Sequence, residues 1–401
     1  MTQPNSPTSS HVVIVGGGVA GLEALLALRA LAGDRVALTL VSKNDWFVDR
    51  PMTVAEPFGF GSAVRLSLPE ITAEAGAEFV SGTVTGVDAA GRRVSCEDGS
   101  DLTFDTLILA SGARARVPFP DAITFGLEGS GQAIREMLDR LRSGEARSVA
   151  FVAPTMTGWL LPLYELALMT ARELARSKVD DFELRLLTPE DRPLALFGGR
   201  VSQGIGRLMG AAGIEFIHAS FAMDDEGGLV YGALGQASSD YVVTLPLLSG
   251  PVLAGVPGSE PHQFVPVDGY GRVSGLADVY AAGDAVDFPV KQGGLAAQQA
   301  DTVAEHVAAR YGAGVEPAPF RPMLRGMLFT GEDPLYMRSD VPGVDPDVSG
   351  AWYPLWWPPT KVAGRYLGPY LSERGSEEGF GAPPVGFTDV DVPLAAMTMP
   401  G

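Results

Sequence analysis

Cysteine is almost absent from this chain of 401 residues, since Cys96 is the only one. A single cysteine cannot form an intramolecular disulfide, and it excludes a redox-active cysteine pair. Lysine is scarce too, with four among 29 basic residues. Acidic residues outnumber basic ones and give a net charge of −19, which argues against binding to nucleic acid or to anionic lipid.

Long apolar stretches are also missing. No run of 18 or more apolar residues occurs in the sequence, so we expect no transmembrane helix. Residues 1–10 are polar and lack the basic start and apolar core of a secretory signal. We therefore expect a cytoplasmic protein, with peripheral contact to a membrane left open.

Glycine is abundant, with 50 residues, and three of them form the most informative motif of the chain. Residues 12–15 predict a short buried strand, and an Ala/Leu-rich helix is expected after the glycines. Gly16, Gly18 and Gly21 between them have the G-x-G-x-x-G spacing. The first glycine permits a tight turn, the second admits a pyrophosphate, and the third lets helix and strand pack closely. This stretch therefore predicts a dinucleotide site at the positive end of a helix.

A second motif lies late in the chain. Residues 279–282 predict a buried strand that ends in Gly283 and Asp284, and a helix is expected from Gly293 and Gly294. The motif resembles that of flavoproteins with two dinucleotide folds, in which the carboxylate binds the ribitol chain of FAD and the helix points toward the flavin pyrimidine. An ordinary turn with a helix cap is the alternative for Gly283 and Asp284 alone. Paired with the first motif, they favour non-covalent FAD over NAD.

Further cofactor contacts are expected where two other strands end. Residues 35–41 predict a second parallel strand, after which many dinucleotide folds place an acid on the adenosine ribose. Ser42 occupies that position and Lys43 follows it, so we expect Ser42, its neighbours or backbone groups to contact the ribose. Residues 106–112 predict a buried strand that ends in a small-residue turn at Gly112. Ser42, Lys43 and Gly112 are therefore candidate cofactor-binding residues.

The middle of the chain repeats the strand-turn-helix pattern without the glycines. Residues 148–153 predict a buried strand and residues 163–175 a helix. Pro154 between them has no N–H, and Met156 adds a side chain where a pyrophosphate needs open backbone. We therefore expect a poor phosphate site here, and NADH and NADPH as poor reductants. Glu165 at the start of this helix is a candidate proton acceptor, or alternatively a carboxylate that stabilises the helix dipole.

The last part of the chain is rich in proline, methionine and aromatic residues. Six large aromatic residues fall within 19 positions, namely Trp352, Tyr353, Trp356, Trp357, Tyr366 and Tyr370. We expect Trp352, Trp356 and Trp357 to be covered, because large apolar rings are seldom left exposed. The interspersed prolines predict a compact, irregular cap over a flavin or an apolar channel. The alternative is a terminal subdomain that packs on the core for stability alone.

These segments together resemble one branch of the flavoproteins. Residues 13–25, 107–112, 242–257, 264–273, 279–301 and 356–371 are similar to the pyridine-nucleotide-disulfide oxidoreductase-like family, in its sulfide:quinone oxidoreductase and type II NADH dehydrogenase branch. The resemblance covers nearly the whole chain and is most specific at residues 291–298, which in that family lie at the flavin pyrimidine and contribute to the quinone side. It implies an α/β fold of two Rossmann-like domains of the glutathione-reductase type with an aromatic-rich C-terminal cap.

The resemblance divides the chain into four parts. We expect the first part of an FAD-binding domain at residues 10–118 and a second, degenerate NAD-type Rossmann-like domain at 119–237. The chain then returns to the FAD-binding domain at 238–313, a part that includes residues 241–245 as a strand. Residues 314–401 form the cap.

The chain departs from the family in one respect that bears on its chemistry. Sulfide:quinone oxidoreductases hold sulfur with redox cysteines, and Cys96 alone is interpreted as a structural thiol in a strand. We therefore expect an FAD-dependent oxidoreductase of bacterial origin that passes electrons from a small donor to a quinone or soluble acceptor. Lys291 is the candidate residue for tuning the flavin, because a cation near N1 and O2 stabilises the negative charge of reduction. A surface lysine is the alternative.

Two other functions remain open from the sequence. One is an NAD(P)H:quinone oxidoreductase that binds nicotinamide without the usual glycine loop. The other is a flavin protein without turnover, acting as an electron carrier or redox sensor. The sequence predicts no metal site, and it leaves the identity of the donor and the choice between a monomer and a homodimer undetermined.

Overall fold

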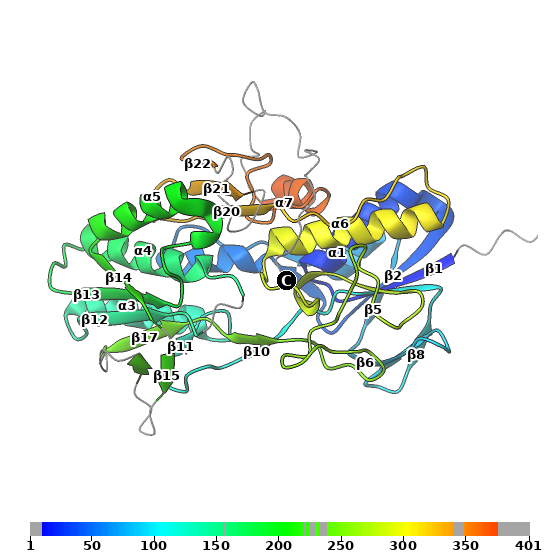
Figure 1. Cartoon of the computed structure of the whole chain (residues 1–401), viewed down its shortest axis with the longest axis horizontal. Coiled ribbons are helices and arrows are strands. Elements are labelled where there is room, and N and C mark those ends of the chain that lie inside the picture. The colour runs from blue at the N-terminus through cyan, green and yellow to red at the C-terminus, as the bar shows by residue number, and fades with distance from the viewer. Residues whose placement is uncertain are drawn as a thin grey trace, which may run out of the picture.

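Two five-stranded parallel sheets form the body of the molecule (Figure 1). The computed structural model describes residues 10–154, 158–219, 221–223, 229–231, 239–339 and 349–375. The two sheets lie side by side, and the C-terminal elements lie over the junction between them (Figure 1). This arrangement confirms the α/β fold with two dinucleotide-type units that the sequence predicts.

The first sheet assembles strands from the beginning and the end of the chain. Its order is β19 (Val279–Ala281), β9 (Thr106–Leu109), β1 (Ser10–Val15), β2 (Val36–Ser42) and β5 (Glu78–Ser81), all parallel. The apolar runs expected at β1, β2, β9 and β19 are therefore confirmed as neighbouring strands. Because the strands are parallel, their carboxyl ends and the residues after them share one edge of the sheet.

Alternation along β1 separates two layers of core. Val12 and Ile14 pack against α1 (Val19–Ala32) and α6 (Gly293–Arg310) on one face of the sheet. Val13 and Val15 pack on the other face, against a layer that includes the antiparallel strands β6 (Val84–Asp88), β7 (Arg93–Cys96) and β8 (Asp101–Thr103). Cys96 is buried in this second layer, as expected of a structural thiol.

The second sheet has the order β11 (Ile123–Thr124), β17 (Tyr241–Thr244), β12 (Ser148–Val152), β13 (Glu183–Thr188) and β14 (Ile214–His218). Our assignment of residues 241–245 to the first domain is wrong, because β17 pairs with β11 and β12. The chain leaves this sheet only after β17, where β18 (Leu247–Ser249) pairs with β10 (Arg114–Arg116). The two crossing segments thus form a short antiparallel ribbon between the sheets.

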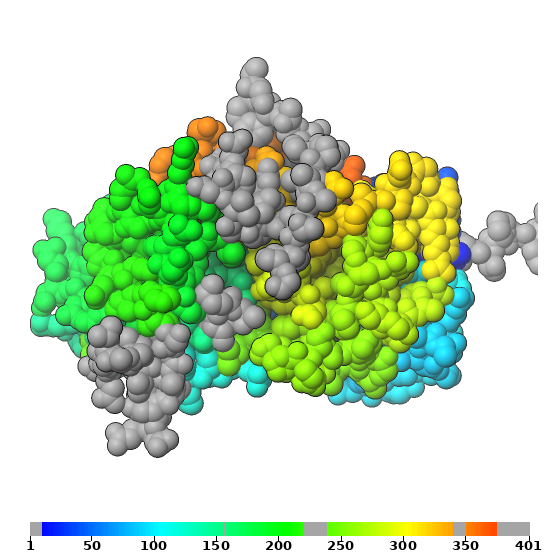
Figure 2. Space-filling view, in the orientation of Figure 1, coloured from blue at the N-terminus to red at the C-terminus, as the bar shows by residue number. Residues whose placement is uncertain are grey.

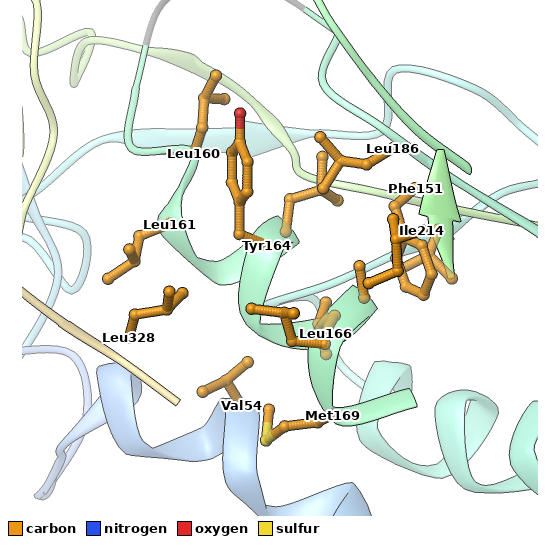
Figure 3. Close-up of a cluster of buried hydrophobic side chains, with 14 of the residues drawn as sticks. Val54, Phe151, Leu160, Leu161, Tyr164, Leu166, Met169, Leu186, Ile214 and Leu328 are labelled. Atoms are coloured by element: carbon orange, nitrogen blue, oxygen red, sulfur yellow. The ribbon is translucent and has the colours of Figure 1, made fainter. Parts of the chain in front are cut away.

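Three helices supply the core of the second unit. They are α3 (Ser130–Ser143), α4 (Leu161–Arg176) and α5 (Gly198–Ala211), and α4 is the most deeply buried. Figure 3 shows Val54 and Leu328 on the same side of α4 as Met169. Val54 comes from the 3₁₀ segment η2 (Arg50–Phe58) of the first unit, and Leu328 from the C-terminal strand β20 (Leu324–Leu328). The α4 helix is therefore the point where three parts of the chain pack together.

The C-terminal segment joins both units. Strands β20, β21 (Leu335–Ser339) and β22 (Ser349–Ala351) form an antiparallel sheet, and α7 (Leu367–Gly375) follows. Leu324 and Met337 pack into the core of the second unit, whereas Leu367 and Leu371 pack against α1 and α6. Figure 2 shows this segment, in orange and red, above the junction of the two units.

The tryptophans of this segment are less covered than expected. Trp356 is 4% exposed and packs with Met327 and Tyr336, but Trp352 is 57% exposed and Trp357 is partly buried. The expectation that all three rings are buried is therefore wrong for Trp352, because this residue lies where the chain leaves β22 for the surface. The remaining described elements are β3 (Trp46–Val48), β4 (Arg65–Ser67), α2 (Leu68–Glu74), β15 (Phe221–Met223), β16 (Leu229–Tyr231), η1 (Gly33–Arg35), η3 (Ala195–Phe197) and η5 (Gly283–Ala285).

Within the described ranges, every helix is too short or too polar to cross a membrane.

Candidate functional site

The glycine turn after β1 is packed so closely that two of its positions require glycine. Gly16 has a φ of +116° and donates its amide to the Val41 carbonyl at 2.8 Å. A Cβ at Gly16 would lie 2.2 Å from the carbonyl oxygen of Ala110, and one at Gly21 would lie 1.8 Å from the Gly16 oxygen. Contacts this short exclude any side chain, so the turn holds α1 against the ends of β1 and β9.

Gly18 has the opposite environment. It is exposed, caps the start of α1 without a side chain, and a Cβ there would meet no atom within 4 Å. The first turn of α1 contains no acidic residue. The N–H groups and positive dipole of this helix end therefore face open space, which fits a pyrophosphate.

The other predicted cofactor residues at this edge are arranged around the turn. Ser42 is buried at the end of β2, and its Oγ accepts the Asn44 amide at 3.3 Å. Lys43 is exposed. Gly112 follows β9 with a φ of +72°, and a Cβ there would also meet no atom within 4 Å. Ser42 thus ends one strand that neighbours β1, and Lys43 and Gly112 follow such strands, at the same edge as Gly18.

Gly283 and Asp284 form the turn after β19. Gly283 has a φ of +78°, its amide donates to Gln299 Oε1 at 2.8 Å, and a Cβ would lie 2.9 Å from the Cβ of Ala20. This glycine therefore lets the turn fit between α1 and α6. Asp284 is partly buried, and burial raises its pKa while Lys291 and Arg50 oppose that shift.

Lys291 is buried rather than exposed, which rules out a surface lysine. Its Nζ donates to the Val286 carbonyl and lies 3.6 Å from the centre of the Phe264 ring. Burial lowers the pKa of Lys291 to about 8, although Asp284 and Asp287 oppose the shift. Lys291 and Asp284 are therefore within electrostatic range of one another.

The start of α6 is the meeting point of several segments. Gln292 caps the helix by accepting the Leu295 amide at 2.8 Å. A Cβ at Gly293 would lie 3.3 Å from Val362, 3.8 Å from Pro51 and 3.9 Å from Val19. The N-terminal ends of α1 and α6 are therefore adjacent, and residues from η2 and the C-terminal segment border them.

A buried charge network lies close to this meeting point. Lys361 Nζ lies 2.6 Å from Glu165 Oε1, and their side chains are 5% and 1% exposed. The same Glu165 oxygen accepts the Phe329 amide at 2.8 Å, and Lys361 also lies 4.1 Å from the centre of the Phe329 ring. Burial raises the pKa of Glu165 and lowers that of Lys361, while each charge opposes the shift of the other.

Asp49, at the start of η2, is the third member of this network. It is buried, its Oδ1 has no hydrogen-bond partner among the described residues, and Lys361 acts on its charge. Burial raises the pKa of Asp49 to about 6, against the effect of Lys361. Sequence reasoning missed Asp49 and Lys361. Lys361 could have been noticed because lysine is scarce in the chain and this one lies in the segment 356–371, which resembles the family. No sequence pattern pointed to Asp49.

Glu165 does not have the helix-dipole environment that was one of the two alternatives expected from the sequence. It lies beyond the first turn of α4, because the helix begins at Leu161, so it does not stabilise the helix dipole there. It is instead an ion-pair partner of the C-terminal segment, with its Oε2 unpartnered among the described residues. A role in proton transfer therefore depends on Lys361 as much as on Glu165.

Little open space remains beside the start of α4 in the described part of the second unit. The cavity beside the start of α4 measures about 20 Å³ and is lined by residues that include Trp159, Leu160 and Glu190. Glu190, two residues after β13, accepts the Tyr164 hydroxyl at 2.5 Å, and that hydroxyl also accepts the Leu194 amide at 3.2 Å. Figure 3 shows the Tyr164 hydroxyl pointing away from Val54 and Met169. Met156, expected in this turn, lies outside the described residues.

A larger depression lies away from all of these groups. It measures about 460 Å³ and borders the start of β19, and Arg272, His306 and Arg310 are among its lining residues. Arg272 pairs with Asp268 at 2.6 Å, and Arg310 pairs with Asp278 at 2.5 Å. Since its charges are paired within the protein and it lies at the amino end of β19, this depression is separate from the glycine turn.

Residues 10–306 match the family model described as pyridine nucleotide-disulphide oxidoreductase. The chain belongs to this family. Members are flavin oxidoreductases, so the chain is an oxidoreductase of that type, as expected. The fold of this family uses the two dinucleotide-type units seen here.

Three relatives illustrate the range of the family. Oxidoreductase ptaL of Pestalotiopsis fici is 24% identical over 79% of this chain and 88% of its own length. The ferredoxin reductase component of a Cupriavidus chlorobenzene dioxygenase is 27% identical over 77% of this chain and 74% of its own. The solved sulfide:quinone oxidoreductase of Aquifex aeolicus has a TM-score of 0.77 at 19% identity, covering 85% of this chain and 86% of that structure.

Proposed function

We propose that the first unit binds one non-covalent FAD across the carboxyl edge of its sheet. The open helix end at Gly18, between the tightly packed Gly16 and Gly21, supports a pyrophosphate position. The remaining assignments follow the family: Ser42, Lys43 and Gly112 toward the adenosine half, Gly283 and Asp284 toward the ribityl chain, and Lys291, Gly293 and Gly294 toward the flavin pyrimidine. When bound, the flavin supplies two-electron redox chemistry, and the residues supply position and charge.

The proposed reaction carries electrons from a small-molecule donor to a quinone or to a soluble acceptor. The named relatives support this range of acceptors, because one is a sulfide:quinone oxidoreductase and another a ferredoxin reductase component. A quinone acceptor would bring the protein to a membrane surface. Sulfide is not the proposed donor, because the chain holds one cysteine, buried in β7.

One observation carries the choice of a donor other than NADH. In dinucleotide folds an acid at the end of the second strand binds the ribose, and the pairing of Val152 with Leu187 gives that position in the second unit to the uncharged Thr188. Glu190 lies two residues after β13. Glu190 already accepts a hydrogen bond from the Tyr164 hydroxyl, and the neighbouring cavity of about 20 Å³ has room for roughly one water molecule. The described part of this site therefore favours a nucleotide-free second unit.

The roles of the two candidate reactive residues follow from their contacts. Lys291 supplies a buried positive charge near Asp284 and the start of α6, where it would stabilise the negative charge that develops on the reduced cofactor. Glu165 has one carboxylate oxygen held by Lys361 and Phe329 and a second that is free to accept a proton. Glu165 is therefore proposed as the proton acceptor of the reaction.

Flavin retention tests the first half of the proposal. A valine at position 18 would project into the space assigned to the pyrophosphate, so Gly18→Val is expected to purify without FAD. Gly204→Val is the matched control, because a Cβ there also meets no atom within 4 Å and Gly204 lies in α5 of the second unit. Full FAD occupancy in Gly18→Val would contradict the assignment of this turn.

Anaerobic stopped-flow reduction tests the second half. We expect a candidate donor other than NADH or NADPH to bleach the bound flavin rapidly, with a quinone analogue restoring its colour. Reduction by NADH at roughly tens per second, a typical enzymatic rate, would instead identify an NAD(P)H:quinone oxidoreductase. If no donor bleaches the flavin, the protein is an electron carrier or a redox sensor.

A further inference from the structure

Three buried charged side chains from separate parts of the chain converge near the start of α6. Glu165 belongs to α4, Lys361 to the C-terminal segment, and Asp49 to the residue before η2. The Glu165–Lys361 pair is closed at 2.6 Å, and Lys361 acts on Asp49 as well. The network therefore holds two carboxylates for one ammonium group.

Asp49 is fixed in place but incompletely bonded. Its amide donates to the Val64 carbonyl at 3.0 Å, and its carbonyl accepts the Met52 amide at 3.0 Å. Its side-chain Oδ1 is buried without a hydrogen-bond partner in the described part of the chain. Glu165 Oε2 is unpartnered in the described residues as well, but the Glu165 carboxylate is held in the ion pair with Lys361. The ion pair stabilises the charged form of Glu165, so Asp49 is the member whose charge changes most readily.

The position of the network connects it to the proposed flavin. Pro51, two residues after Asp49, and Val362, next to Lys361, both border Gly293 at the start of α6. As long as Glu165 holds no proton from the donor, its charge and that of Lys361 cancel, and the ionisation of Asp49 decides whether the network is neutral or carries one negative charge. A buried charge acts over a longer range than a charge in water, since little solvent screens it.

We propose that Asp49 is a positioning residue for electron transfer. Its ionisation changes the net charge of the Asp49–Lys361–Glu165 network, and this charge sets the reduction potential of the flavin at the start of α6. The inference rests on the proposed FAD site. Two electrons come from the donor of the proposed reaction. As they arrive, the Asp49 carboxylate takes up one proton from solvent, and the same proton leaves when the acceptor removes the electrons.

The charged groups around the network define the expected pH range. Lys361 lowers the pKa of Asp49 against burial, which raises it, and the result is about 6. Glu165 acts on Lys361 from α4, whereas Arg50 and Lys291 act on Asp284 instead. Below about pH 6 the network is neutral, and above that pH its negative charge disfavours the addition of electrons.

Spectroelectrochemical titration of the FAD-loaded protein between pH 5 and pH 8, at roughly one-unit steps, tests the proposal. In the unaltered protein, the plot of midpoint potential against pH is expected to steepen near pH 6. In Asp49→Asn the steepening disappears, and the potential is higher than in the unaltered protein at the alkaline end but equal to it at the acidic end. Asp121→Asn, an exposed carboxylate of the second unit, is the matched control and keeps the unaltered profile.

A second variant covers the case in which Asp49→Asn does not fold. Asp49→Glu keeps the carboxylate and is expected to keep a steepening, displaced in pH. Identical profiles for the unaltered protein and Asp49→Asn, or a profile without any change of slope in both the unaltered protein and Asp49→Glu, would overturn the proposal. A protein that purifies without flavin would overturn the proposed function itself, so the two failures are distinguishable.

Discussion

The two units share a five-stranded parallel sheet but differ in the described residues beside the start of the helix that follows the central turn. In the first unit, glycine leaves the helix end at Gly18 uncovered while Gly16 and Gly21 hold it tightly against the sheet. In the second unit, Trp159 and Leu160 line the start of α4, and Tyr164 takes the acid at the end of the neighbouring strand. The same sheet topology therefore surrounds an open helix end in one unit and closely packed side chains in the other, so topology alone does not determine the space available for a dinucleotide.

The same contrast holds for the buried charges. Near the start of α6, Lys291 is buried and lies within electrostatic range of Asp284, which follows β19. In the second unit, Glu190 is bonded to Tyr164, and Glu165 is bonded to Lys361 and Phe329. Charged groups of the second unit thus connect separate protein segments, and we expect them to contribute to its stability.

The largest expected effect comes from adding a side chain to the tight part of the first turn. Gly21→Val places a Cβ 1.8 Å from the Gly16 carbonyl oxygen, so α1 must move away from the sheet. We expect loss of FAD binding and a fall in unfolding free energy of more than about 4 kcal/mol. Chemical denaturation and flavin absorbance measure both. Gly204→Val in α5 should change neither by a comparable amount, and a stable, FAD-loaded Gly21→Val would contradict the packing described.

The next effect tests whether charge in the second unit serves stability. Replacing Lys361 with methionine leaves Glu165 buried and unpaired, which is expected to cost about 3–5 kcal/mol in unfolding free energy. Replacing both members of the pair, with Glu165→Leu and Lys361→Met, should cost clearly less than the sum of the single changes. Urea denaturation of the four proteins in this cycle gives the answer. Additive costs would show that the pair does not act as a unit.

Burial of Asp49 is expected to make the free energy of unfolding depend on pH, an effect of intermediate size. Its pKa rises from 3.8 in the unfolded chain to about 6 in the folded protein, so ionised Asp49 destabilises the fold. The stability present below pH 3.8 is lost as the pH rises through about 6. Asp49→Asn lacks this loss and should gain about 3 kcal/mol relative to the unaltered protein between those limits. Denaturant titrations across this range measure it, and a pH-independent difference would show that Asp49 does not titrate there.

The smallest effect concerns the hydrogen bond between Tyr164 and Glu190 in the second unit. Tyr164→Phe removes the hydroxyl between Glu190 and the Leu194 amide, which is expected to cost about 1–3 kcal/mol in unfolding free energy. The flavin content should stay the same, because Tyr164 belongs to the second unit. Thermal unfolding and absorbance spectra check both outcomes. Loss of flavin from Tyr164→Phe would contradict the account, because it would show that the second unit also contributes to flavin binding.

Local patterns in the sequence were sufficient for the first turn. The apolar run of β1, the glycine spacing and the Ala/Leu-rich α1 lie within one short stretch, and the structure confirms each element. The strand β19 and the start of α6 at Gly293 were predicted in the same way. Such elements are determined by residues near one another in the chain, so periodicity and glycine spacing reveal them.

The parts that failed depend on contacts between distant residues. The placement of β17 is set by pairing with β12, and a short apolar strand carries no local mark of the sheet it joins. Asp49, Glu165 and Lys361 come from three separate segments, so no spacing pattern connects them. The exposure of Trp352 likewise depends on where β22 lies rather than on the hydrophobicity of the ring.

Counting bound dinucleotides tests the contrast between the two turns most directly. Native mass spectrometry of the purified protein, with and without an excess of NADH, reports the number and mass of the ligands on each chain. We predict one FAD per chain in both conditions and no second dinucleotide. A chain that carries FAD and NADH together, or one that carries no FAD, would contradict the account.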